Sequence, residues 1–256
     1  MKNKVFVALL LVMLIAPILD AAIAFDNAAS TSSAANVSSL ETGSWAIAGS
    51  ERILIAGAMS GAGTPVAPSA AKWGGSGGTD LTIIGVSTNF ATFGHMSQWR
   101  LVAPSASTTT LYVSWPSNQD ETAIGGASYT GVDQTTPLGT QASATGAPIS
   151  TAATVDVSSA AGELVVDVVA FLDNSGNITS LTAGAGQTAR VDIDLVGGID
   201  FESFGMSEED GASTVTMSWT GTGTNTGWTI KGVPLKPSGG APTCVPMLTL
   251  LGVGAC

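Results

Sequence analysis

One short apolar run limits what this chain can fold into. It extends from Glu163 to Leu172, is rich in β-branched residues, and lies between Ala-Ala-Gly and Asp-Asn-Ser-Gly. Its length suits a buried β-strand and is too short for a helix that crosses a membrane. Further alternating runs recur along the chain between stretches rich in Gly, Pro, Ser and Asn, and none has a convincing helical period. The sequence therefore predicts an all-β fold, an antiparallel β-sandwich of the jelly-roll type.

The two ends of the chain differ from its centre. Residues 1–24 contain two lysines, an apolar run and Ala22-Ile23-Ala24, which is the pattern of a cleaved secretory signal peptide. The alternative is an uncleaved membrane anchor, which a proline and an aspartate near the end of the run disfavour. Residues 25–237 are expected to form one sandwich domain, and residues 238–256 a linker with a short apolar C-terminal tail. We therefore expect a secreted or cell-surface protein that meets the membrane only through its signal or a sorting segment.

The tail allows two interpretations. Its apolar part, Val245 to Leu251, is faintly similar to the opening of bacterial C-terminal sorting tails, which would make it a truncated sorting signal. Alternatively, it adds a strand to a neighbouring subunit, so that the protein self-associates. Cys244 and Cys256 both lie in this tail, and in an exported protein they would form one small disulfide loop that cannot hold the sandwich core together.

Several segments together resemble a known group of proteins. They are Trp99 to Pro104 (WRLVAP), Gly131 to Thr140 (GVDQTTPLGT), Ala160 to Asp167 (AAGELVVD, within AAGELVVDVVA), Ala183 to Thr188 (AGAGQT) and Trp228 to Pro237 (WTIKGVPLKP). The chain looks like a widespread group of uncharacterised bacterial secreted β-sandwich domains, and the similarity covers most of the predicted mature chain. The resemblance implies a jelly-roll-like sandwich outside the cell. It implies no activity and no catalytic residues.

The charge of the chain restricts its partners. Eight basic and 19 acidic residues give a formal net charge of −11, so the protein repels phosphate backbones and nucleic acid is not expected as a partner. Divalent cations and cationic surfaces are compatible with this charge. The alternative is that the charge only keeps a protein rich in Ser and Thr soluble.

Residue patterns for catalysis are weak. His95 is the only histidine, so any triad or multi-histidine metal site would have to include it. Residues 74–78 and 184–189 match a nucleophile elbow and a dinucleotide-binding loop in spacing alone, because no helix follows either. We therefore predict no enzyme; the alternative is a glycoside hydrolase or lyase that acts on polysaccharides. Four carboxylates were considered for that role, and the sequence pairs none of them: Glu163, Asp167, Glu202 and Glu208.

Acidic residues accumulate between Gly197 and Gly211, which we expect to be irregular. Because Ca²⁺ prefers several oxygen ligands that converge from a loop, this segment suggests a calcium site. No fixed motif supports it, and the alternative is a solvated acidic loop; no other cofactor is expected. The four candidate ligands are Asp200, Glu202, Glu208 and Asp210.

The aromatic residues suggest a ligand surface. Trp115 and Trp219 fall on apolar faces of their strands and should belong to the core, whereas Trp73 and Tyr112 are the aromatic side chains expected to be exposed and to stack on a sugar. We therefore predict a secreted or cell-surface, non-enzymatic binding or adhesion module, with an extracellular glycan or cell-surface molecule as its partner. The main alternative is a structural subunit of an extracellular filament or surface layer.

Overall fold

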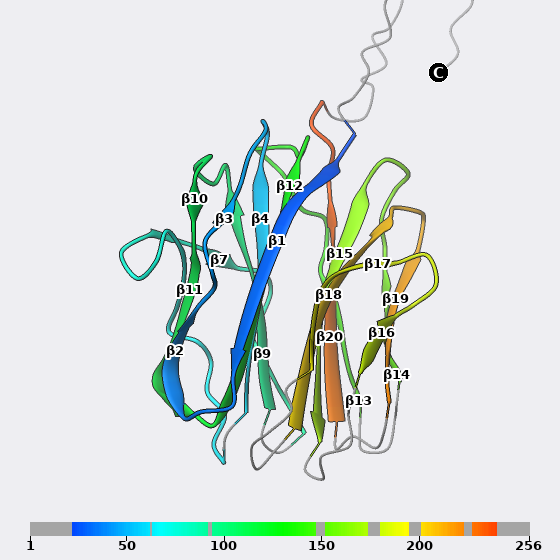
Figure 1. Cartoon of the computed structure of the whole chain (residues 1–256). Helices are drawn as coiled ribbons and strands as arrows, with labels where there is room; N and C mark the ends of the chain where they lie inside the picture. Colours follow the sequence, from blue (N-terminus) through cyan, green and yellow to red (C-terminus); the bar gives the residue numbers. More distant parts are fainter. Residues whose placement is uncertain are drawn as a thin grey trace, which may run out of the picture.

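All of the regular structure in the described residues is β-strand (Figure 1). The computed structural model describes residues 22–61, 63–91, 94–146, 152–173, 180–194, 201–222 and 227–239. Within these ranges no helix is long and apolar enough to cross a membrane. The expected all-β class is confirmed.

The first half of the chain forms one sandwich. Its inner sheet has the order β1-β12-β4-β9-β7, with β8 also on β9, and its outer sheet has the order β2-β11-β5-β6, with β3 and β10 paired separately. The strands are β1 (Ala24–Ser33), β2 (Val37–Glu41), β3 (Trp45–Ala46), β4 (Ile53–Gly61), β5 (Ala70–Trp73), β6 (Thr79–Asp80), β7 (Thr82–Ile83), β8 (Thr88–Phe90), β9 (Gly94–Val102), β10 (Thr108–Thr109), β11 (Leu111–Gln119) and β12 (Glu121–Thr130).

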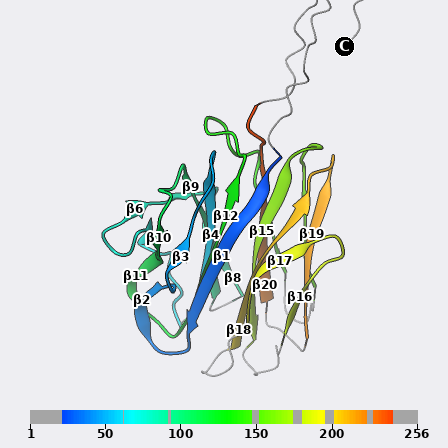
Figure 2. The same cartoon turned by 45° about the horizontal axis from the view of Figure 1, so that its top comes forward.

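The second half forms another sandwich beside the first. Its inner sheet has the order β13-β20-β15-β18-β17 and its outer sheet the order β14-β19-β16. Figures 1 and 2 show the two inner sheets facing each other, with the outer sheets on the far sides. The strands are β13 (Ala142–Gly146), β14 (Ala152–Val157), β15 (Leu164–Asp173), β16 (Leu181–Ala183), β17 (Thr188–Asp194), β18 (Phe201–Asp210), β19 (Val215–Gly221) and β20 (Gly227–Leu235).

The two halves repeat one topology. In the first half β1 pairs with β12, β12 with β4 and β4 with β9; in the second half β13 pairs with β20, β20 with β15 and β15 with β18. The sequences agree locally, since Leu111 to Trp115 reads LYVSW in β11 and Val215 to Trp219 reads VTMSW in β19. The described strands therefore form two similar halves that share a central interface, and a single domain over residues 25–237 stays a prediction.

Strand β15 explains why the apolar run is continuous. Val166 and Val168 face the first half across the central interface, whereas Val165 and Val169 face the outer sheet of their own half. Because both faces are buried, no position on the strand needs a polar residue for solvent. The prediction of a buried strand at this run is confirmed.

A pair of glycines lets the two inner sheets approach closely. Gly57 on β4 and Gly125 on β12 are direct cross-strand partners. A Cβ atom on Gly57 would lie 2.7 Å from the ring of Phe204, and a Cβ atom on Gly125 would lie 2.9 Å from it. The fully buried Phe204 ring on β18 therefore fills a hollow that exists because these two positions have no side chain.

The connection between the halves is fixed to the end of the last strand. The Asp133 carboxylate accepts hydrogen bonds from the backbone N–H groups of Thr135 (2.7 Å) and Thr136 (3.1 Å), which closes a turn and lowers the pKa of Asp133. The backbone of this segment also bonds to residues 234–238, for example from Gly139 N to Pro234 O at 2.9 Å. Two of the segments on which the resemblance rests are therefore partners of each other.

The turn at Gly49 sends the chain from one sheet to the other, since β3 pairs with β10, whereas β4 pairs with β9 and β12. One local prediction is wrong. The acidic segment 197–211 was expected to be irregular, but its part from Phe201 to Asp210 is strand β18. Pairing with β15 and β17 on its two sides makes this segment regular.

Candidate functional site

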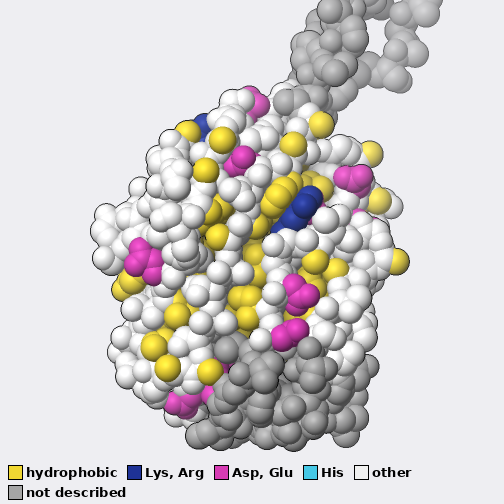
Figure 3. Space-filling model, viewed as in Figure 1, with side chains coloured by type: hydrophobic (Ala, Val, Ile, Leu, Met, Phe, Trp, Pro, Cys, Tyr) yellow, Lys and Arg dark blue, Asp and Glu magenta, His cyan; other side chains and the backbone are white. Residues whose placement is uncertain are grey.

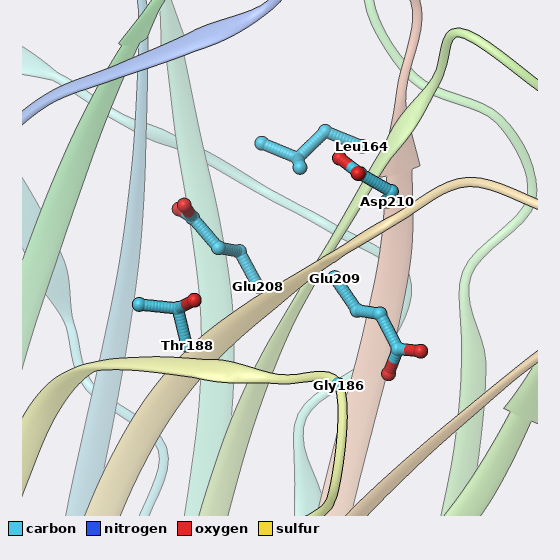
Figure 4. A pocket seen from close by; sticks show the side chains of 6 residues that line it. All are labelled: Leu164, Gly186, Thr188, Glu208, Glu209 and Asp210. Atoms are coloured by element: carbon cyan, nitrogen blue, oxygen red, sulfur yellow. The ribbon is translucent and has the colours of Figure 1, made fainter.

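A groove lined by carboxylates opens where β17 begins. Its volume is about 300 Å³, and we call it the acidic groove (Figure 4). Pairing between β17 and β18 starts at Thr188 and Glu208, so Glu209 and Asp210 extend past the first residue of β17. The sheet therefore loses its edge strand here, which leaves space beside the end of β18. The residues that line the groove are Leu164, Gly186, Thr188, Glu208, Glu209 and Asp210.

A second hollow continues the acidic groove toward the start of β1. Its volume is about 360 Å³, and it shares Leu164 and Asp210 with the groove. It is also lined by Glu163 and, on the other side, by Ala22 and Ile23. Ala22 and Ile23 belong to the expected signal peptide, so cleavage after Ala24 would widen the groove at this end.

One carboxylate of the groove is held by a cation. Glu208 forms an ion pair with Arg190 on β17, and the side chain of Glu208 is 10% exposed. The Arg190 guanidinium also lies 3.8 Å from the centre of the Phe25 ring, a cation–π contact. Phe25 in turn packs edge-on against Tyr129, with the ring centres 6.0 Å apart. These contacts fix Glu208 at the seam between the two halves.

Polar atoms of and next to this pair are buried. The Tyr129 hydroxyl and Oε2 of Glu208 are both buried, and the hydroxyl lies beside the Glu208 carboxylate. Burial, followed by the charge of Glu208 and a side-chain hydrogen bond to it, raises the pKa of Tyr129 well above its ordinary value, so the hydroxyl stays protonated. Figure 3 shows a basic side chain on this face beside hydrophobic side chains, with acidic side chains around them.

The remaining carboxylates of the groove are more exposed and have no paired cation. Glu209 and Asp210 form no salt bridge within the described residues. Burial and the adjacent Asp210 raise the pKa of Glu209. Glu208 and Glu209 lie on opposite sides of β18, and Figure 4 shows their side chains pointing apart. Acidic side chains of the groove therefore lie on both sides of β18.

Asp167 lies elsewhere, inside the second sandwich. Its carboxylate accepts hydrogen bonds from Ser207 N (2.7 Å), Ser207 Oγ (2.8 Å), Trp219 Nε1 (2.9 Å) and Gln187 Nε2 (3.4 Å). Burial raises the pKa of Asp167 to about 7, although these hydrogen bonds oppose the shift. Asp167 therefore belongs to a structural network. Glu202 and Glu208 are six residues apart on one strand, so they do not face each other across a cleft.

The four carboxylates considered for calcium do not come together. Asp200 lies outside the described residues, and Glu202 and Glu208 are about 20 Å apart because a strand rises roughly 3.3 Å per residue. Only Glu208 and Asp210 are neighbours on one face of β18. Among the residues that the structure describes, no group of three or more His, Cys, Asp or Glu side chains is arranged to hold a metal ion. The extended strand separates Glu202 from Glu208, and calcium binding itself stays a prediction.

The two aromatic candidates have different surroundings. Trp73 is only 2% exposed and packs edge-on against Trp45, with ring centres 4.9 Å apart, so the prediction that it is exposed is wrong. Tyr112 is half-buried and lies between Glu41 and Lys72 on the outer sheet. The predicted core positions of Trp115 and Trp219 are confirmed.

His95 and the glycine-rich segments have structural surroundings. His95 is 3% exposed, and burial together with Lys231 lowers the pKa of His95 to about 4. Residues 74–78 form the turn between β5 and β6, and residues 184–187 form the turn between β16 and β17. Cys244 and Cys256 and the expected disulfide lie outside the described residues, as does the apolar tail.

Sequence reasoning missed three members of the site. Phe25, Tyr129 and Arg190 come from β1, β12 and β17 and contact one another next to Glu208 of the groove, and nothing in their spacing indicates this. The small number of basic residues could have drawn attention to Arg190, because an arginine in so acidic a chain is expected to pair with a carboxylate. Comparisons of the chain with family models, with curated proteins and with solved structures found no match.

Proposed function

We propose that the protein is a secreted or cell-surface binding module without catalytic activity, and that the acidic groove takes a cationic group of its partner. The observation that carries the proposal is the charge of the groove. Glu208, Glu209 and Asp210 line it and Glu163 lies beside it, whereas Arg190 is engaged with Glu208. A cation in the groove would meet several carboxylates close together, and their mutual repulsion would decrease.

The double sandwich supports a binding role. Its inner strands are buried on both faces, so the groove is framed by rigid elements, and a rigid frame reduces the entropy lost when a ligand binds. Of the four carboxylates that the sequence offered for sugar hydrolysis, Asp167 lies in a structural network, Glu202 and Glu208 lie apart on one strand, and Glu163 lines the hollow beside the groove. The partner class remains the one expected from the sequence, an extracellular glycan or cell-surface molecule, here one that presents amino groups.

The groove predicts salt-sensitive binding of cations. We expect spermidine, as a probe, to bind the full-length chain in isothermal titration calorimetry at low salt and to bind about tenfold or more weakly to a Glu209→Gln/Asp210→Asn double variant. The matched control is Asp80→Asn/Asp156→Asn, which removes two exposed carboxylates on the outer sheets. If spermidine binding weakened equally in both double variants, the net charge of the protein would attract the cation, and the acidic groove would have no specific role. Addition of 0.3 M salt should weaken binding to the wild type.

A second candidate function is a structural subunit of an extracellular assembly. The start of β1 and the end of β20 lie at the same end of the molecule (Figures 1 and 2). The described chain ends there, with Ser238 bonded to Glu51 and to the backbone of Gly131. We propose that the apolar segment Val245 to Leu251, which lies outside the described residues, adds a strand to another subunit.

The tail can be tested by truncation. We expect the full-length chain to form oligomers in size-exclusion chromatography with light scattering, and a chain that ends at Gly239 to be monomeric. Gly239 is the matched end point because it retains the contacts of Ser238. If the full-length chain stays monomeric at high concentration, the proposed assembly function is ruled out and the proposal of a binding module remains.

A further inference from the structure

Another pocket, separate from the acidic groove and the hollow next to it, lies at the opposite edge of the central interface. The acidic groove is beside β1, which forms one edge of the first inner sheet, and this pocket is beside β7, which forms the other edge. Its volume is about 450 Å³. Residues from β7 and β9 form one wall, and residues 138–141 of the connection between the halves form the other. We call it the Arg100 pocket.

Arg100 is a free cation in this pocket. Its half-buried guanidinium makes no hydrogen bond or ion pair within the described part of the chain. The other described basic side chains, Lys236 excepted, have partners: Arg52 with Pro104 O, Lys72 with Asp80, Arg190 with Glu208, and Lys231 with Val86 O and Thr88. In a chain with a net charge of −11, an arginine that lines a pocket without an acidic neighbour is unusual.

The surrounding residues leave the guanidinium available. No acidic residue lines the described part of the pocket. The amide nitrogen of Gln141 donates to Ile84 O (3.1 Å) and to Oε1 of Gln98 (2.7 Å), which holds this side chain in the wall. Thr140 also lines the pocket, and Thr82 on β7 is the cross-strand neighbour of Arg100, so two hydroxyl-bearing residues lie in or next to the pocket.

The rest of the pocket is apolar. Ile84 is 7% exposed and packs into the central core together with Leu138, and both line the pocket. Ile83 and Val86 are 37% and 72% exposed, and they are the large hydrophobic side chains that stand out of the described surface. Ile83 lines the pocket, and Val86 follows three residues later. An apolar surface of this kind next to a pocket is typical of a binding site.

We propose that the Arg100 pocket binds a carboxylate that carries a short aliphatic chain. The planar guanidinium matches a carboxylate through two parallel N–H···O hydrogen bonds, and the nearby hydroxyls offer further donors. The aliphatic chain would cover Ile83, Ile84 and Leu138 and remove their surface from water. This site lies apart from the acidic groove and takes a ligand of the opposite charge, so it goes beyond the proposed function and does not depend on it.

Hexanoate is the probe that tests the pocket. We expect it to bind the full-length chain with a dissociation constant on the order of 1 mM, measured by NMR titration of the Arg100 side chain and of the Ile83 and Leu138 methyl groups. Hexanol, which lacks the charge, and acetate, which lacks the chain, should each bind at least about tenfold more weakly. Arg100→Gln should lose about tenfold or more in hexanoate affinity. Arg100→Lys should lose less, because a lysine keeps the positive charge but cannot donate two parallel hydrogen bonds to the carboxylate.

The matched control is Lys236→Gln, which removes a described basic side chain that forms no salt bridge in the described residues and does not line the pocket. It should bind hexanoate like the wild type, and the melting temperature of each variant shows whether the fold is retained. The proposal is overturned if 20 mM hexanoate shifts no pocket resonance, if Arg100→Gln binds hexanoate within twofold of the wild type, or if hexanol binds as well as hexanoate.

Discussion

Phe204→Ala is expected to lower the free energy of unfolding by about 3 to 5 kcal/mol, as for other buried aromatic side chains. The Phe204 ring is fully buried between the two inner sheets, in the hollow above Gly57 and Gly125. Its removal leaves a cavity that rigid strands on both sides cannot fill. Urea denaturation measures the loss, and Ile83→Ala, a truncation of an exposed side chain, should change the free energy by about 0.5 kcal/mol or less.

The glycine opposite the ring provides a second measurement. Gly57→Ala places a methyl group 2.7 Å from Phe204 Cζ and 2.8 Å from Val168 Cγ1, so it should destabilise the wild type. In the Phe204→Ala background one of these clashes is gone, and Gly57→Ala should then cost less. A double-mutant cycle should give a coupling of about 0.5 to 3 kcal/mol. Strict additivity would show that the ring does not occupy the hollow.

Asp167→Asn is expected to change how the stability depends on pH. Burial raises the pKa of Asp167 from 3.8 to about 7, so between these values the folded state holds a proton that the unfolded state has released. The stability contributed by this proton is fully present below pH 3.8 and is lost as the pH rises through about 7. At 1.36 kcal/mol per pKa unit, the loss is on the order of 4 kcal/mol.

Other groups also titrate in this range, so the comparison is between two curves. The free energy of unfolding of the wild type minus that of Asp167→Asn should decrease as the pH rises from 4 to 8. At pH 8 the ionised Asp167 accepts all four hydrogen bonds, whereas in the variant an amide N–H₂ group faces one of the donors, which offsets part of the difference. Two parallel curves would show that Asp167 keeps its ordinary pKa.

The predictions made from sequence succeeded where local pattern determines structure. The run from Glu163 to Leu172 contains strand β15, which is buried on both faces, and alternation along other strands indicated which of their side chains face the core. Such patterns follow from the two-residue period of a strand, which a single chain segment carries by itself. They also placed Trp115 and Trp219 in the core.

The predictions failed where the partner of a segment mattered. Trp73 has a sequence context that suggests exposure, but β5 pairs with β11, and this brings the ring against Trp45. The acidic segment from Phe201 to Asp210 is a strand because β15 and β17 pair with it. Neither pairing can be deduced from the segment itself, since each joins residues far apart in the chain.

The sequence by itself determined the all-β class, the position of the most buried strand and the acidic character of the surface, because these properties depend on residue type and spacing. Only the tertiary structure decided that the chain forms two sandwiches, that Phe25, Tyr129, Arg190 and Glu208 meet at one groove, and that Arg100 lines a pocket without a counter-charge. The physical reason is that a strand's own residues determine which of its faces is buried, whereas the pairing of distant strands determines which side chains share a site.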